Sequence, residues 1–260
     1  DWSSDVCSSD LALEAVLSQQ EQWSRERLRN YPARPEVLAY RFDPALDDAA
    51  LRQRFLHALR VNPQIPLPLF LQLPPDQAAA TRPELPASAV STLSRDNGLE
   101  GTRFVSLSVG EWVPALDVIA TAADEPDYGL DLGLWEDNGT EHGRRYGFGK
   151  QPFGNPALAF SSQAPFHMGF FHESPVVYAA AGFLRRTYPE YRVHLWQTLA
   201  RQALKTGHDY WAWRFAGWAL HYVQDLTQPY HARVLPGVSV VRMLGIQGLD
   251  LLGVSTPKNK

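Results

Sequence analysis

The string HYVQDLTQPYH, which spans residues 221 to 231, strongly restricts the conformation of its backbone. His221 and Asp225 are four residues apart, so a helix would present both side chains on one face, with β-carbons about 5–6 Å apart. Pro229 ends such a helix, and the turn that follows can bring His231 back beside the pair. Imidazole and carboxylate groups are good zinc ligands. The string therefore predicts a helix end that holds a metal ion.

Taken one at a time, these histidines have an alternative interpretation as packed structural residues, and the aspartate as a helix-end residue. The complete pattern, H-x-x-x-D-[LIV]-x-Q-P-x-H, favours the metal site, because it resembles the signature of the zinc-dependent phospholipase C and single-strand-specific nuclease superfamily. The aromatic-rich stretch HDYWAWRFAGWAL, residues 208–220, is similar to the helix that leads into this motif in the family. The resemblance implies a mainly α fold, a multi-helix zinc phospholipase C/nuclease-like domain with a long Gly/Pro-rich loop insertion over residues 124–165.

The same resemblance implies a set of ligands for one zinc ion. It places His167, in APFHMGF, together with His221, Asp225 and an aspartate from TAADEPD. Asp124 is the preferred aspartate because it follows two alanines at the end of a predicted helix, and Asp127 is the alternative. Asp225 is expected to bridge to a second metal ion.

His231 would belong to a further zinc ion, with up to three in the intact protein. For the first zinc ion, His172 is the alternative ligand to His167, which lies five residues before it. The family completes its other two sites with a processed N-terminal tryptophan and with a later histidine, and no histidine follows His231 here. We therefore expect a chain truncated at both ends, inactive or nearly so by itself. A processed N-terminal amine also implies a secreted or periplasmic protein whose signal peptide is missing.

The first eleven residues, DWSSDVCSSDL, differ in composition from the rest and are similar to the translation of a sequencing-adapter oligonucleotide. We interpret residues 1–11 as an artefact and residues 12–260 as a single, incomplete α-helical domain. Cys7 is the only cysteine, so the remaining residues have neither disulfides nor thiolate ligands. Without the three aspartates of the artefact, 25 acidic residues stand against 24 basic ones, which makes the chain nearly neutral.

Periodicity and composition predict helices over residues 12–29, 45–60, 111–123, 175–188, 190–206 and 208–226. Five prolines between residues 63 and 75 predict an extended connector. No stretch alternates as a strand should, and none has the roughly 20 uninterrupted apolar residues of a membrane span. The Gly/Pro-rich segment 124–165 has no regular period, and we expect it to border the metal site as a flexible lid.

The chemistry that the resemblance implies is zinc-dependent hydrolysis of a phosphodiester by a metal-activated water, with Asp124 and Asp225 in catalytic roles. The substrate is either a phospholipid head group or single-stranded nucleic acid. A near-neutral chain offers no general attraction for nucleic acid, whereas Phe166 and Phe170 could contact lipid. We therefore prefer a phospholipase C-like enzyme with peripheral membrane contact and no obligate protein partner. The alternatives are a nuclease and a non-catalytic helical protein with a structural metal site closed by four protein ligands.

Overall fold

The structure is a computed structural model that describes residues 10–74, 82–93, 99, 101–234 and 236–237. It is mainly α, as predicted. Residues 1–9 of the proposed artefact lie outside the described residues, and residues 10 and 11 begin the first helix, α2. In the described part, no helix is both long and apolar enough to cross a membrane.

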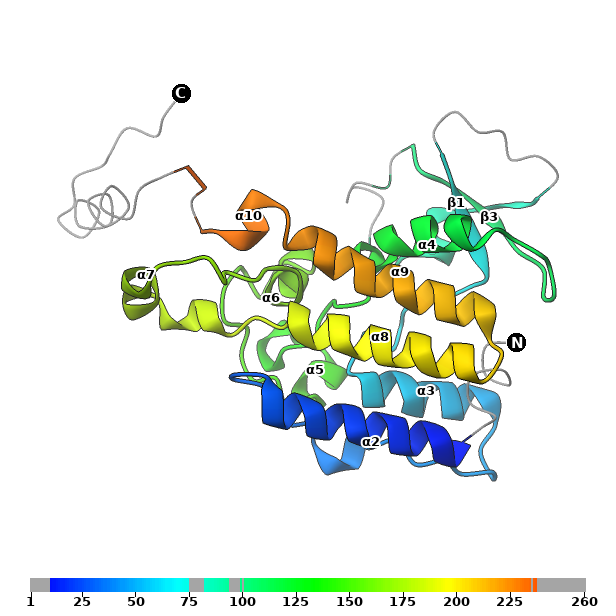
Figure 1. The fold of residues 1–260 in the computed structure, drawn as a ribbon, viewed down its shortest axis with the longest axis horizontal. Coiled ribbons are helices and arrows are strands. Elements are labelled where there is room, and N and C mark those ends of the chain that lie inside the picture. Colours follow the sequence, from blue (N-terminus) through cyan, green and yellow to red (C-terminus); the bar gives the residue numbers. More distant parts are fainter. Residues whose placement is uncertain (1–9, 75–81, 94–98, 100, 235, 238–260) are drawn as a thin grey trace.

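The longer helices of the described residues pack together as the body of the molecule (Figure 1). Helix α8 (Pro189–Lys205) packs against α9 (Asp209–Asp225) and against α2 (Asp10–Arg27), while α9 also packs against α4 (Ala115–Asp124). Helix α3 (Asp48–Leu59) begins where the Asp47 side chain accepts a hydrogen bond from the Ala50 amide. Its buried face joins the same core.

The apolar side of α9 explains why this helix is central. Trp211, Phe215, Trp218 and Tyr222 recur at helical spacing and are all buried. The Trp218 ring meets that of Trp196 on α8 edge to face, with centroids 4.7 Å apart. Because this aromatic face fixes the rotation of α9, it also fixes where His221 and Asp225 project.

A small antiparallel sheet stands beside α4, in the strand order β1 (Phe70–Leu73), β3 (Arg103–Ser106), β2 (Glu84–Leu85). Sequence periodicity did not predict these strands, because two to four residues are too short to show alternation. Leu71 pairs with Val105 in the register, and both pack against Val118 of α4. The sheet therefore packs against α4 and also contacts α9 through Tyr210 and Trp213.

Residues 124–165 were expected to form a flexible lid, but a large part of this segment, above all residues 128–135, is instead buried in the core. It contains the short helices η3 (Glu125–Tyr128), η4 (Glu136–Asn138), α5 (Glu141–Arg145) and η5 (Phe160–Gln163). Leu134, Trp135 and Tyr146 are fully buried, and the Trp135 indole N–H donates to the Ser162 carbonyl at 2.7 Å. Burial of apolar side chains, not regular periodicity, orders this segment.

The remaining short elements connect the longer helices and the strands. They are α6 (Ala164–His167), α7 (Pro175–Ala180), η6 (Gly182–Arg185), α10 (Pro229–Ala232), η1 (Glu36–Leu38) and η2 (Ala87–Ala89). Figure 1 shows α6, α7 and α10 at one end of the molecule, near the end of α9 that carries Asp225. This end holds the candidate site.

Candidate metal centre

Three segments far apart in the sequence bring histidine and aspartate side chains together. Helix α9 supplies His221 and, as its last residue, Asp225. Helix α6 ends at His167, whose buried ring lies edge to face with the His221 ring at a centroid distance of 4.9 Å. The Gly169 amide donates to the His231 carbonyl at 2.9 Å, which ties the chain after His167 to α10.

The third segment is η3, and it supplies Asp127. One ligand atom from each of Asp127, His167 and His221 lies within 4.8 Å of the other two, so these residues form a candidate metal-binding triad. Asp225 belongs with them, because its Oδ2 is 2.9 Å from His167 Nδ1 and 3.2 Å from His221 Nε2. Two nitrogens and two carboxylate oxygens therefore face one another.

The distances from the two histidine nitrogens to each other and to the two carboxylate oxygens are close to the dimensions of a zinc site. Bonds of about 2.0–2.1 Å in a tetrahedron place neighbouring ligand atoms about 3.3 Å apart. His167 Nδ1 lies 2.9 Å from His221 Nε2 and 3.6 Å from Asp127 Oδ1. His221 Nε2 lies 3.8 Å from the same Asp127 oxygen. The residues present thus fit a zinc ion in both donor chemistry and spacing.

Each histidine has its other ring nitrogen turned toward an acceptor. His221 Nδ1 donates to the Ala123 carbonyl at 2.7 Å, because a carbonyl can only accept. His167 Nε2 lies 3.4 Å from Asp131 Oδ2. Histidines that bind metals are usually oriented in this way, with the second nitrogen protonated and directed at a carboxylate or carbonyl. The pattern leaves Nε2 of His221 and Nδ1 of His167 free to bind a cation.

The electrostatics of the cluster also favour a cation. Burial opposes protonation of His167, but the carboxylates of Asp131 and Asp225 outweigh it and raise the pKa of His167 to about 10. Burial likewise opposes ionisation of Asp225, yet hydrogen bonds from His167, His221 and His231 hold its pKa well below the usual range. A proton on His167 thus occupies the position that a metal ion would take.

The second oxygen of Asp225 points to the last histidine of the motif. His231 Nδ1 lies 2.9 Å from Asp225 Oδ1, and the His231 side chain is 31% exposed. Asp225 therefore stands between two donor groups, one at each carboxylate oxygen. This is the arrangement expected of a carboxylate that bridges two metal positions.

Of the two aspartates left open by the sequence, the structure brings Asp127 to the histidines and not the preferred Asp124. Asp124 accepts a hydrogen bond from Gln72 Nε2 at 2.8 Å and ends α4. The 3-10 turn of η3 carries the chain one turn, about 6 Å, further along before Asp127 appears. Of the two histidines, His167 joins the cluster, whereas His172 is exposed and its carbonyl accepts from Arg233.

The two expected substrate contacts occupy the core. Phe166 is fully buried among the rings of Trp135, Phe148 and Tyr188. Phe170 is also buried, in a small cluster with Val177 and Leu184. Phe166 does not reach the surface, whereas Phe170 is 5% exposed and lines a cavity of about 320 Å³ together with Met168 and Tyr230. The next residue, Phe171, is 47% exposed.

Two buried ion pairs, which the sequence did not reveal, anchor the segments that carry the ligands. Glu125, two residues before Asp127, accepts hydrogen bonds from Arg214 and from the Trp218 indole. Asp131 pairs with Arg192 at 2.6 Å. Each pair joins residues more than 60 positions apart, so only the tertiary fold brings them together.

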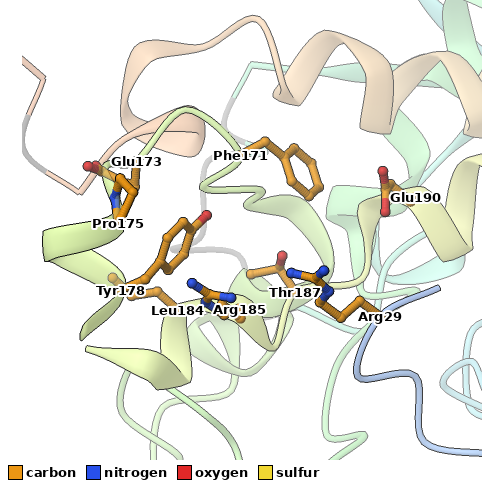
Figure 2. Close-up of a pocket in the computed structure, with 9 residues that line it drawn as sticks. All are labelled: Arg29, Phe171, Glu173, Pro175, Tyr178, Leu184, Arg185, Thr187 and Glu190. Carbon is orange, nitrogen blue, oxygen red and sulfur yellow. The ribbon is translucent and has the colours of Figure 1, made fainter. Parts of the chain in front are cut away.

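A cavity of about 410 Å³ lies beside the segment that follows His167 (Figure 2). Its lining combines aromatic side chains with charges of both signs, and consists of Arg29, Phe171, Glu173, Pro175, Tyr178, Leu184, Arg185, Thr187 and Glu190. None of the four proposed ligands lines it, so this cavity is separate from the metal position. Two arginines facing two glutamates give it no net charge.

Comparison of the chain with protein-family models, with curated proteins and with solved structures gave no match. The function must therefore be argued from the geometry of the site.

Proposed function

We propose that this chain is a zinc-dependent phosphodiester hydrolase of the phospholipase C type, with the fold that the motif resemblance implies. The observation that carries the proposal is the cluster of His167, His221, Asp225 and Asp127, in which the two histidine nitrogens lie 2.9 Å apart and 2.9–3.8 Å from a carboxylate oxygen of each aspartate. The proposal extends to as many as three zinc ions and to a secreted or periplasmic location, which rest on the motif resemblance alone.

The side chains around the site would have different roles in the hydrolysis. Zinc held there would polarise a phosphoryl oxygen and activate water as the nucleophile. Asp225 would hold two donor groups in fixed relation, because its oxygens contact His167 and His231 on opposite sides. Asp127, with 52% of its side chain exposed, marks the open side of the cluster, where a carboxylate can orient water by accepting its hydrogen bond.

Accessibility favours a catalytic role over a structural one. A structural zinc is normally closed off by its protein ligands, whereas a catalytic zinc keeps a position open to solvent. Here His167 and His221 are buried, but Asp127 and His231 are not. The catalytic role first assigned to Asp124 therefore passes to Asp127 in this proposal.

Apolar surface near the ligands favours a lipid substrate. Phe171, Val176, Phe183 and Tyr230 are exposed around α7, η6 and α10. A neighbouring cavity of about 320 Å³ is lined mainly by apolar residues and includes Met168 and Tyr230, the chain neighbours of His167 and His231. Exposed apolar groups that gather at one site mark contacts with lipids or proteins.

The test is hydrolysis by the full-length product of the gene, assayed on phosphatidylcholine vesicles and on single-stranded DNA. We expect zinc in the purified protein, turnover of the lipid, loss of turnover with chelators, and loss in Asp225→Asn and His221→Ala. His172→Ala is the matched control and should keep activity, because His172 lies outside the cluster. Turnover of DNA alone would identify a nuclease. Bound zinc without turnover of either substrate would identify a structural metal site, and full activity in both cluster variants would exclude the mechanism.

A further inference from the structure

The two histidines of the cluster are oriented by different kinds of acceptor. His221 Nδ1 donates to a backbone carbonyl, that of Ala123, which every sequence supplies. His167 Nε2 faces the side chain of Asp131, in the turn that follows η3. Only the second arrangement depends on the identity of a residue, because the sequence must provide a side chain that can accept a hydrogen bond at this position.

Asp131 is held from three sides and is 0% exposed. Arg192 Nη2 lies 2.6 Å from Oδ1, and the Tyr222 hydroxyl donates to Oδ2 at 2.5 Å. Arg192 is itself fixed, because it donates to the carbonyls of Leu59 at 3.0 Å and Arg60 at 2.8 Å. The guanidinium therefore determines which oxygen of Asp131 is left to face His167.

The charge balance agrees with this geometry. Arg192 carries a permanent positive charge, and its Nη2 forms an ion pair with Asp131 Oδ1 at 2.6 Å. The residue is thus a carboxylate, which can only accept hydrogen bonds. His167 Nε2 is buried, has no hydrogen-bond partner among the described residues and lies 3.4 Å from Asp131 Oδ2. A proton on this nitrogen would be directed at the carboxylate and would leave the Nδ1 lone pair directed at Asp225 and His221.

We propose that Asp131 is a positioning residue of the metal centre, which fixes the ring orientation and the tautomer of His167 so that Nδ1 binds the metal ion. This inference rests on the proposed zinc site, and Asp131 itself contacts no reacting atom. Arg192 and Tyr222 act through Asp131, because they fix its carboxylate in turn.

The sharpest perturbation is Asp131→Asn, which keeps the size and changes the donor pattern. Arg192 is always charged, so it must retain an oxygen in front of it. The amide nitrogen then takes the place of Oδ2 and presents N–H groups to His167 Nε2. That nitrogen becomes an acceptor, the proton moves to Nδ1, and the nitrogen meant for the metal is blocked. An Asp→Asn change behind a functional histidine is known to select the wrong tautomer in this way.

We expect Asp131→Asn to weaken zinc binding by about 10–100-fold, measured by competition with a chelator. The absorption spectrum of the cobalt(II)-loaded protein should also change, because one nitrogen ligand is lost. Leu195→Ala serves as the control. It lies on the same helix as Arg192 and lowers stability without touching a ligand, so it should bind zinc nearly as wild type does.

A measurement on the wild-type protein covers the case in which Asp131→Asn does not fold. Nitrogen-15 NMR of the zinc-loaded protein should show His167 protonated at Nε2 and coordinated through Nδ1. Coordination through Nε2, or an unchanged zinc affinity in Asp131→Asn, would overturn the inference and leave the proposed function standing. An equal loss of zinc affinity in Leu195→Ala would show that Asp131 affects zinc binding only through the stability of the fold, which would also overturn the inference. Absence of zinc and cobalt binding by the wild type would overturn both proposals.

Discussion

Replacing Arg214 with methionine should destabilise the protein strongly, because it leaves a buried carboxylate without its cation. The side chains of Arg214 and Glu125 are 1% and 2% exposed, respectively. Arg214 Nε donates to Glu125 Oε2 at 2.9 Å, and Nη1 donates to the Pro68 carbonyl at 2.8 Å. Methionine fills most of the space, so the loss is mainly electrostatic. Breaking a buried pair on one side costs about 3–5 kcal/mol of unfolding free energy.

For a chain of this size, that loss lowers Tm by about 6–20 °C. Urea denaturation and calorimetry would measure it, with Arg25→Met as the matched control. Arg25 pairs with Glu21 at the surface, so its loss should cost less than about 1 kcal/mol. The double variant Glu125→Gln/Arg214→Met should regain most of the stability, because Trp218 can still donate to the amide oxygen. A single Arg214→Met variant within about 1 kcal/mol of wild type would refute the assignment of a buried ion pair.

Three further predictions concern the site and its surroundings. Asp127→Asn should weaken zinc binding at least about tenfold, because even residues that only hydrogen-bond to metal ligands typically cost that much when they are mutated. Asp124→Asn should leave zinc affinity unchanged. Equal effects of the two variants in a chelator competition would contradict the structure. Free zinc at about a hundredfold above Kd should add about 2.7 kcal/mol of stability, which is about 5–11 °C in Tm, and EDTA should reverse the shift; a Tm insensitive to both would exclude a specific site. Phe166→Ala should cost about 3–5 kcal/mol in urea denaturation, while Phe171→Ala should stay within about 0.5 kcal/mol and slow lipid hydrolysis; the opposite pattern would place Phe166 at the surface.

The sequence predicted the long helices well because their apolar faces repeat at helical spacing. The expected helix over residues 208–226 is α9 (Asp209–Asp225), and the expected helix over 190–206 is α8 (Pro189–Lys205). The expected helix over 175–188 is interrupted, since α7 ends at Ala180 and η6 follows. The spacing of His221 and Asp225 was sufficient to place both on one face, because that inference needs only local geometry.

The contacts around the site could not be predicted in the same way, because they depend on tertiary packing. No sequence pattern around Asp131 indicates its role, because it contacts Arg192 and Tyr222 only after α8 and α9 pack together. The choice between Asp124 and Asp127 depended on the turn of η3, which composition does not specify. The strands β1, β2 and β3 were too short for alternation to reveal them.

The close approach of α4 to α9 is a further feature that only the structure reveals. A β-carbon at Gly217 would lie 2.5 Å from Ala122 Cβ and 2.8 Å from the Ile119 carbonyl oxygen. Glycine there lets the two helices come close enough for Ala123 to reach His221, one turn further along α9. In the sequence, Gly217 reads only as a weak helix former among aromatic residues.

The most direct test of the proposed centre is to locate zinc in crystals of the protein by anomalous scattering at the zinc absorption edge. The structure predicts a peak about 2.0–2.2 Å from four atoms, namely Asp127 Oδ1, His167 Nδ1, His221 Nε2 and Asp225 Oδ2. Crystals of Asp225→Asn grown under the same conditions should lose most of that peak. Zinc found only elsewhere on the protein, or no peak between His167 and His221, would contradict the account.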